Sequence, residues 1–306
     1  MVTYETCLLN TMLRLIRFRL LMSATNIGLT FCLQQALYLT IDGADMTISI
    51  VTGGVTTDLG VADTAAPFAN VSPALPTGHV TNDLLLLGAG VKDFATTMAA
   101  NTFIATSTIT NGSTGQGLDT GSMRCSAWYK VDDGAEAAPA IIYSAAYNPT
   151  MAWILGLHST VVADTWVVTN TTATDATATS TTFSAAGAAT LGFNTGDWVV
   201  VFASCKTDGA AMTSGAITAT GATFGSLTEQ ISNNISTFGN DGAFYCWTGE
   251  VTAGPATDVP TFTATTASGL SDGSCIILRI QEPVLGAPLG GSNMVTKQAI
   301  NRASFW

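Results

Sequence analysis

Charged side chains are scarce in this sequence, and basic ones are the scarcest. Only 10% of the residues are Asp, Glu, Lys or Arg, against roughly 25% in average soluble domains. The 10 basic residues face 21 acidic ones, which leaves a formal net charge of −11. Binding to nucleic acid requires clustered Lys and Arg to displace counterions from phosphate. The long central part of the chain has only Lys92, Arg124, Lys130, Lys206 and Arg279, so the sequence predicts no nucleic-acid partner.

Recognisable catalytic and metal-binding motifs are also missing. The chain has two histidines, His79 and His158, and its cysteines form no CxxC pair. No GxSxG motif, zinc-ligand spacing or phosphate-binding glycine loop occurs. The sequence therefore predicts a protein that is not an enzyme and has no cofactor. Cys205, Cys246 and Cys275 lie in apolar runs, which favours free buried thiols and assembly in a reducing cytoplasm.

One acidic cluster leaves two interpretations open. Asp132, Asp133 and Glu136 lie close together in the segment 130-KVDDGAEAAP-139. Acidic residues beside glycine are typical of a hairpin tip, where their side chains bond to the local backbone. Converging carboxylates are also what a calcium ion requires, so a calcium site here is the alternative.

The first 45 residues differ from the rest of the chain. Arg14, Arg17 and Arg19 interrupt an apolar stretch, which excludes both a signal peptide and a membrane-spanning helix. Residues 1–45 are either an amphipathic helical arm that binds a partner or lipid surface, or a segment that precedes the true start at Met46.

From Met46 onward, short apolar alternations are separated by Gly, Asn, Asp and Pro, which is typical of β-sandwiches. No stretch there sustains the periodicity of a helix. Most tryptophans fall in apolar runs and are predicted to be core residues, while Trp166 and Tyr147 are predicted to be less buried. Strands are expected at 46–51, 84–91, 124–131, 152–162, 197–205, 243–251, 261–266 and 274–280.

Two segments read almost alike, 81-TNDLLLLGAGVKD-93 and 195-TGDWVVVFASCKTD-208. Asp83 and Asp197 are 114 residues apart, and so are Lys92 and Lys206. Further strands recur in the same order, and a repeat of this length matches a complete sandwich domain. The sequence therefore predicts an all-β chain with two tandem, duplicated antiparallel β-sandwich domains, at 46–163 and 164–283. An uninterrupted apolar run in each copy predicts a central strand that is covered on both faces.

The last residues, 284–306, form a Gly- and Pro-rich tail with two aromatic residues at its end. Flexible segments of this kind carry a binding group away from a domain, and buried aromatics stabilise interfaces. Either the tail docks on a partner or it folds back on the second domain. The predicted partner-binding residues are Lys297, Arg302, Phe305 and Trp306.

Around 195-TGDWVVVFASCKTD-208 and 274-SCIILRIQEP-283 the chain resembles jelly-roll or Ig-like modules of tailed-bacteriophage virion proteins. The resemblance covers both repeats but not residues 1–45, and Asn82 stands where the second copy has Gly196. It implies a non-enzymatic virion component, either a capsid decoration (cement) protein or a tail-associated one, assembled in the host cytoplasm. It also implies contact with the major capsid protein or other virion proteins, and homo-oligomerisation. The alternative is a carbohydrate- or receptor-binding module of a phage tail or cell surface.

Overall fold

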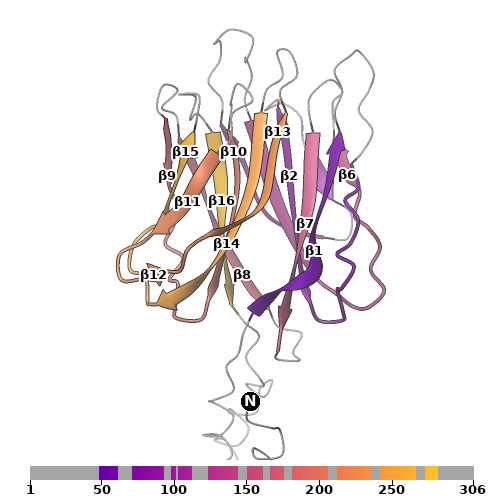
Figure 1. The fold of residues 1–306 in the computed structure, drawn as a ribbon, viewed down its shortest axis with the longest axis horizontal. Coiled ribbons are helices and arrows are strands. Elements are labelled where there is room, and N and C mark those ends of the chain that lie inside the picture. Colours follow the sequence, from indigo (N-terminus) through magenta and orange to yellow (C-terminus); the bar gives the residue numbers. More distant parts are fainter. Residues whose placement is uncertain are drawn as a thin grey trace, which may run out of the picture. The chain divides into compact units, whose positions relative to one another are not determined.

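The chain divides into two units, Met1–Asp45 and Met46–Trp306. The computed structural model describes only strands, turns and connections of the second unit, and every regular element in this described part is a β-strand (Figure 1). The predicted all-β class is confirmed there, whereas the terminal segments 1–45 and 284–306 lie outside the described residues. These residues are 48–60, 71–92, 98–100, 103–111, 123–143, 150–160, 166–175, 181–205, 212–235, 242–266 and 273–281.

Two large antiparallel sheets form the centre of the structure. The order in the first sheet is β1 (Ile48–Gly60), β7 (Thr150–Ser159), β2 (Leu84–Lys92), β5 (Met123–Val131) and β4 (Ile104–Asn111). The order in the second sheet is β8 (Val167–Asp175), β16 (Gly273–Gln281), β10 (Trp198–Cys205) and β14 (Gly242–Ala253). Along the outer side of β14 lie β13 (Thr228–Ile235) and the short β12 (Thr223–Phe224).

Two smaller sheets complete the described fold. The third sheet has the order β11 (Met212–Thr218), β15 (Thr261–Thr266) and β9 (Thr182–Ala186). The fourth pairs β3 (Met98–Ala100) with β6 (Ile141–Tyr143), and Val71 forms a bridge to Ile141. The strand order β1-β7-β2-β5-β4 of the first sheet thus has the same form as the order β8-β16-β10-β14-β13 in the second.

Three hydrophobic cores separate four layers of strands. One core lies between the first sheet and the fourth, with Leu85, Leu87 and Ile141 among its members. Another lies between the second and third sheets and includes Phe183 and Phe262. The core between the two large sheets contains residues of both predicted domains, so the two halves of the chain bury a common apolar surface. Figure 1 shows the layers in this order, from β6 and β1 at one side to β9 and β11 at the other.

The apolar runs predicted to be central strands are central. β2 lies between β7 and β5, and β10 lies between β14 and β16. Leu84 and Leu86 face the core between the large sheets, while Leu85 and Leu87 face the opposite core. Because both faces are covered, alternation of polar and apolar residues is absent from these strands, and all four leucines are 0% exposed.

Glycines in β2 allow the two large sheets to approach each other closely. A Cβ atom on Gly90 would lie 1.6 Å from Cε1 of Phe244 on β14, and one on Gly88 would lie 2.6 Å from Cε2 of Trp153 on β7. Trp153 in turn contacts Phe202 on β10 edge-on, with 5.5 Å between ring centroids. A ring of the second sheet, Phe244, and a ring of the neighbouring strand β7, Trp153, therefore fill the space that side chains on β2 would otherwise occupy.

Four cysteines lie in the described part of the chain, and all are free and buried, as predicted: Cys125, Cys205, Cys246 and Cys275. Burial raises the pKa of the Cys125 thiol to about 12. It also raises the pKa of Cys246 and of Cys275, and Cys125 raises both further because two nearby thiolates would repel each other. At neutral pH these thiols stay protonated and are therefore poor nucleophiles.

The close approach at Gly90 gives a stability prediction. We expect Gly90→Ala to lower the free energy of unfolding by about 2 kcal/mol, because overpacking a tight core typically costs about 1–3 kcal/mol. Gly225→Ala is the control, since its Cβ would meet nothing closer than the Glu250 carbonyl at 3.5 Å. Chemical denaturation measures both variants. Equal stability of Gly90→Ala and the wild type would contradict the packing described for β2.

The buried thiols give a pH prediction. Above the ordinary thiol pKa of about 8.5 the unfolded chain loses protons that the folded chain retains, so stability must fall as pH rises toward 12. Because Cys125 contributes to this fall, the difference in unfolding free energy between pH 8 and pH 10 should be smaller in Cys125→Ala, by about 1–2 kcal/mol. Urea denaturation at the two pH values measures this difference. The prediction fails if the two proteins lose the same free energy.

Candidate functional site

Two contacts between a histidine and a buried aspartate lie at the end of the first sheet at which β2 begins. Asp83 stands directly before β2, and its side chain is only 2% exposed. One carboxylate oxygen accepts a hydrogen bond of 2.8 Å from the backbone N–H of Val80. The other lies 2.6 Å from Nδ1 of His158. Antiparallel pairing of β2 with β7 places His158 beside Asp83, since Leu84 pairs with Leu157.

A second histidine is bound to a second buried carboxylate nearby. Nδ1 of His79 is hydrogen-bonded to Oδ2 of Asp132, whose side chain is 0% exposed. Oδ1 of Asp132 accepts a hydrogen bond of 2.6 Å from the N–H of Gly134. His79 precedes the turn that starts β2, and Asp132 follows the end of β5. The pair therefore connects two loops at the same end of the sheet.

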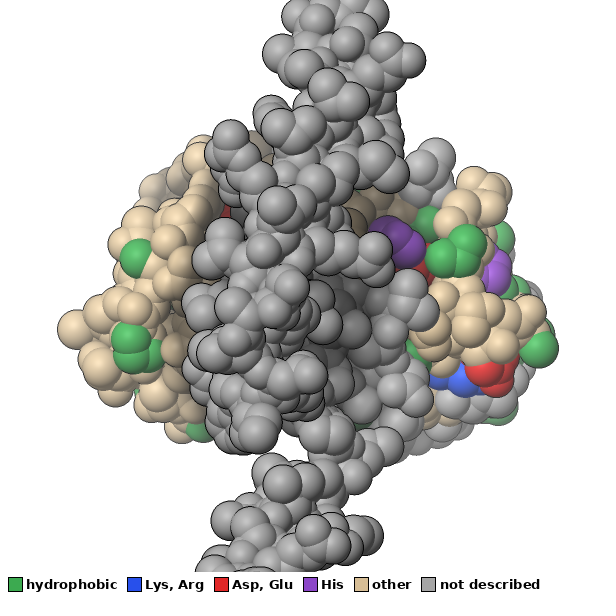
Figure 2. Space-filling view, turned by 90° about the horizontal axis from the view of Figure 1, so that it is seen from below, with side chains coloured by type: hydrophobic (Ala, Val, Ile, Leu, Met, Phe, Trp, Pro, Cys, Tyr) green, Lys and Arg blue, Asp and Glu red, His purple; other side chains and the backbone are tan. Residues whose placement is uncertain are grey.

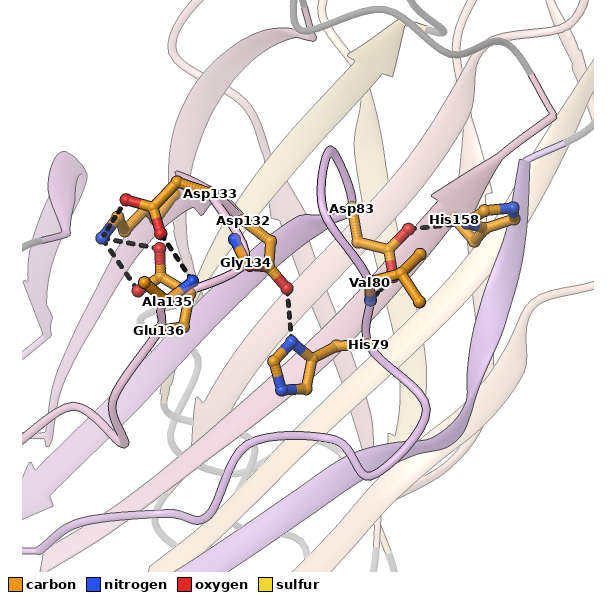
Figure 3. Close-up of polar contacts among 10 residues, drawn as sticks. His79, Val80, Asp83, Asp132, Asp133, Gly134, Ala135, Glu136 and His158 are labelled. Carbon is orange, nitrogen blue, oxygen red and sulfur yellow. Dashed lines mark hydrogen bonds and ion pairs between the residues drawn. The ribbon is translucent and has the colours of Figure 1, made fainter.

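The two imidazole rings do not converge on a common point. Figure 3 shows His79 and His158 on opposite sides of the Val80–Asp83 turn, each with Nδ1 toward its carboxylate and the rest of the ring directed away from the other histidine. Both histidines reach the side of the molecule seen in Figure 2. An Asp-His pair is part of a nucleophilic triad, but the third member must be a hydroxyl or thiol bonded to Nε2. Within the described residues, only carboxylates are bound to these rings.

The corresponding turn before β10 has the same backbone geometry. Asp197 Oδ2 accepts a 2.6 Å hydrogen bond from the N–H of Asn194, as Asp83 does from Val80. Gly196 and Asn82 both have a positive φ, 87° and 76°. This left-handed conformation suits glycine, and among the other residues asparagine tolerates it best. The Asn82-for-Gly196 difference between the two segments therefore preserves the turn.

The partner of the aspartate differs between the two turns. Asp197 is bound by Nε of Arg279 at 2.5 Å, and Nη1 of Arg279 donates to the carbonyl of Leu191 at 3.0 Å. Asp83 has His158 instead. Arginine carries a permanent charge, whereas histidine is the side chain that titrates near neutral pH. Both solutions give a buried carboxylate a hydrogen-bonded partner, as burial of a charge requires.

The His79–Asp132 pair also has a counterpart, and that counterpart is apolar. Position 193, 114 residues after His79, is Phe193. The N–H of Asp132 donates to the Asp83 carbonyl at 2.8 Å, and the N–H of Val251 donates to the Asp197 carbonyl at 2.8 Å. Val251 therefore occupies the place of Asp132 in the second half. Phe193 and Val251 are both 0% exposed and belong to one core. The first half of the chain thus has a polar pair at two places where the second half has two apolar side chains.

The ammonium group of Lys130 already lies beside the acidic cluster of Asp132, Asp133 and Glu136. Ligand atoms of Asp132, Asp133 and Glu136 lie within 4.8 Å of one another. Nζ of Lys130 lies 2.6 Å from Glu136 Oε1 and 3.9 Å from Asp133 Oδ2 (Figure 3). A calcium ion would have to displace this ammonium group and compete with His79 for Asp132. The contacts therefore favour the hairpin interpretation, in which Asp133 accepts a hydrogen bond of 2.9 Å from the N–H of Ala135.

Trp166 corrects one prediction from the sequence. It was expected to be less buried, but it is only 7% exposed and belongs to the core between the large sheets. Its indole N–H donates a 2.8 Å hydrogen bond to the carbonyl of Asn82. The residue stands directly before β8, so this bond ties the start of the second half of the chain to the turn of the first. Tyr147 lies outside the described residues.

The start of the first described strand, β1, and the end of the last, β16, lie at this same end. Ile48 at the start of β1 pairs with Ser159, the neighbour of His158. Gln281 at the end of β16 pairs with Val167, the neighbour of Trp166. Val167 is 46% exposed, and Val80 in the nearby turn is 51% exposed. The predicted partner-binding residues of the C-terminal tail, Lys297, Arg302, Phe305 and Trp306, lie outside the described residues.

Comparison of the chain with protein-family models, curated proteins and solved structures gives no significant match. The part of the chain that the structure describes has no helix of the length and apolar character needed to cross a membrane.

A double-mutant cycle tests whether the His79–Asp132 contact is a structural cross-link. We expect Asp132→Ala and His79→Ala each to lower the free energy of unfolding. Their coupling energy should be about 1.5 kcal/mol or more, because the effects of substitutions within one buried polar network are not additive. The longer contact between Lys130 and Asp133, 3.9 Å with the Asp133 side chain 64% exposed, is the control and should couple by less than about 0.5 kcal/mol. Additive effects for His79 and Asp132 would show that the contact contributes nothing to stability.

Proposed function

We propose that this chain is a non-enzymatic structural protein of a virus particle, and most specifically a capsid decoration (cement) protein that binds the shell. In this role its partners are the major capsid protein or other virion proteins, together with further copies of itself. Its location is the virion, which is assembled in the host cytoplasm. The observation that supports the proposal most is that β1 starts and β16 ends at the same end of a densely packed β body.

We also propose that residues 46–163 and 164–283 are tandem copies of one antiparallel sandwich of the jelly-roll or Ig-like kind. The equal strand order of the two large sheets supports this. So do the matching backbone bonds at the two turns, where Asn82 donates to the Asp132 carbonyl and Gly196 to that of Val251, both at 2.8 Å. A duplicated sandwich presents two related surfaces on a single body, which suits attachment to a shell of repeated subunits.

The shared core supports a mechanical role. Because both halves contribute to the core between the large sheets, separating them would expose aromatic side chains of β7, β10 and β14. Burial of a large apolar side chain is worth about 1.5–3 kcal/mol. A body joined in this way transmits force between two attachment points instead of hinging between them, which is what a protein that reinforces a shell requires.

The end of the first sheet that carries the His79–Asp132 and His158–Asp83 contacts supports a binding role over a catalytic one. Each histidine there is bound to a buried carboxylate, and the thiols of Cys125, Cys246 and Cys275 have raised pKa values. These groups stabilise the body. Attachment then falls to the terminal segments, whose individually modest contacts gain avidity when many symmetry-related copies bind one particle.

A carbohydrate- or receptor-binding module is the second candidate function. A groove beside β11 and β12 favours it. Phe224 in this groove pairs with Val251, whose N–H bonds to the Asp197 carbonyl, so the groove lies at the same end of the sheets as the end of β16.

Truncation tests the docking role of the tail. We expect deletion of residues 284–306 to abolish co-sedimentation with the particle while the thermal midpoint of unfolding stays unchanged. The double variant Phe305→Ala/Trp306→Ala should weaken association more than Lys297→Ala/Arg302→Ala, because aromatic side chains contribute most at buried interfaces. Full association after truncation would refute the docking role. A large fall in the thermal midpoint would show that the tail folds back on its own second domain.

A further inference from the structure

A groove of about 510 Å³ lies where β11 turns into β12, beside the loop that leads to β15. This volume falls within the range of about 300–1,000 Å³ that is common for small-molecule sites. Its lining is made mainly of threonine, alanine and apolar side chains, with one carboxylate, Asp258. The lining contains no Lys, Arg or His, so the groove has nothing to neutralise an anionic ligand.

The carboxylate of Asp258 is held in a fixed orientation. Oδ1 accepts a hydrogen bond of 2.6 Å from the N–H of Thr220, and Oδ2 accepts one from the hydroxyl of the same residue. Each carboxylate oxygen can accept further hydrogen bonds, and Asp258 is exposed. A pair of adjacent ligand hydroxyls can therefore donate to the two oxygens together, and hydrogen bonds to an ionised acceptor are stronger than neutral ones.

The walls of the groove are preorganised. The turn from Ala219 to Ala222 is closed by a hydrogen bond of 3.2 Å, and Thr257 donates its N–H to the Thr220 carbonyl at 2.8 Å. Gly221 has φ of +84°, and a Cβ there would lie 2.5 Å from the Pro255 carbonyl oxygen. Since the turn and the loop already support each other, a ligand would pay little ordering entropy on binding.

The remaining lining combines hydroxyl groups with a small apolar surface. Thr218 and Thr223 are exposed, and a threonine hydroxyl both donates and accepts hydrogen bonds. Phe224 is partly exposed, and its ring is fixed edge-on against Phe193 with 5.2 Å between ring centroids. A neutral sugar has this same combination, because its hydroxyls lie around the edge of a ring whose faces carry C–H groups.

We infer that the groove bounded by Thr218, Phe224 and Asp258 binds a neutral saccharide, with Asp258 accepting hydrogen bonds from two adjacent sugar hydroxyls. A cationic side chain of a peptide would satisfy the carboxylate but would leave the surrounding threonine hydroxyls without complementary groups. An acidic sugar would be repelled by Asp258 and by the net charge of −11. The inference does not depend on attachment to a virus particle, since the site is built from the end of β11, from β12, from the start of β15 and from the loop that carries Asp258.

The test is an array of neutral, sialylated and sulfated oligosaccharides probed with the full-length protein, followed by calorimetric titration of the best neutral ligand. We expect binding among the neutral sugars only, with affinity at least tenfold lower in both Asp258→Asn and Thr218→Val. Thr213→Val is the matched control, because Thr213 is also exposed on β11 but does not line the groove, and its affinity should equal that of the wild type.

Circular dichroism and thermal unfolding establish that each variant is folded, and Thr218→Val remains decisive if Asp258→Asn loses its fold. The inference is overturned if the array shows no neutral ligand, if the three variants bind equally, or if only acidic sugars bind. A lysine-rich peptide is probed in parallel, and binding of this peptide without any neutral sugar also overturns it. Loss of particle association in the truncated protein would leave sugar binding intact, so the two proposals fail separately.

Discussion

The packing of the two large sheets depends on glycines in β2, which leave room for an aromatic ring of the second sheet, Phe244, and for Trp153 of the neighbouring strand β7. Gly90 has no Cβ where Phe244 lies, and Trp153 covers Gly88 while contacting Phe202. Packing of this density leaves no room for an added methyl group without displacement of a ring. Gly88 and Phe202 occupy corresponding positions, 114 residues apart, and carry the smallest and one of the largest side chains. The interface between the halves is therefore complementary and not symmetric.

The packing of the two large sheets also explains why buried aspartates lie at one end of the structure. Once β2 and β10 are buried on both faces, the aspartates that start them are buried too, and each needs a hydrogen-bonded partner. Arg279 serves Asp197 and His158 serves Asp83. Trp166 also donates a hydrogen bond to the Asn82 carbonyl in the turn before Asp83, which fixes the start of the second half at the end of the sheets where β1 starts and β16 ends. Because the core is rigid, the positions from which the terminal segments start are fixed relative to each other, and these are the segments proposed to bind a partner.

Much of the fold could be predicted from the sequence, because local patterns decided it. Uninterrupted apolar runs at Leu84–Leu87 and in the second copy indicated central strands, and the turn residues before them indicated where those strands begin. The surface shared by the two halves could not be predicted in the same way, since a strand covered on both faces does not reveal what covers it. For the same reason Trp166 was expected to be less buried than it is.

The candidate sites were harder to predict. The contact between His79 and Asp132 joins residues 53 positions apart, and neither residue alone indicates the other. A sequence signal existed only for His79, which aligns with Phe193 at the 114-residue spacing. Asp132 and Val251 are 119 residues apart, so only the fold shows that these two positions correspond. The groove at Asp258 had no such signal, because single threonines and one aspartate are common in a sequence of this composition and only the fold brings them together.

A rigid β body that reinforces a particle through terminal attachment segments, as proposed here, must be present in many copies at regular positions. Electron cryo-microscopy of the particle with which the protein purifies tests this most directly. We expect symmetric density for the four-layered body at high copy number on the capsid shell, with contacts to the shell at the end where β1 starts and β16 ends. A few copies at a single vertex, or attachment through the opposite end of the sheets, would contradict it.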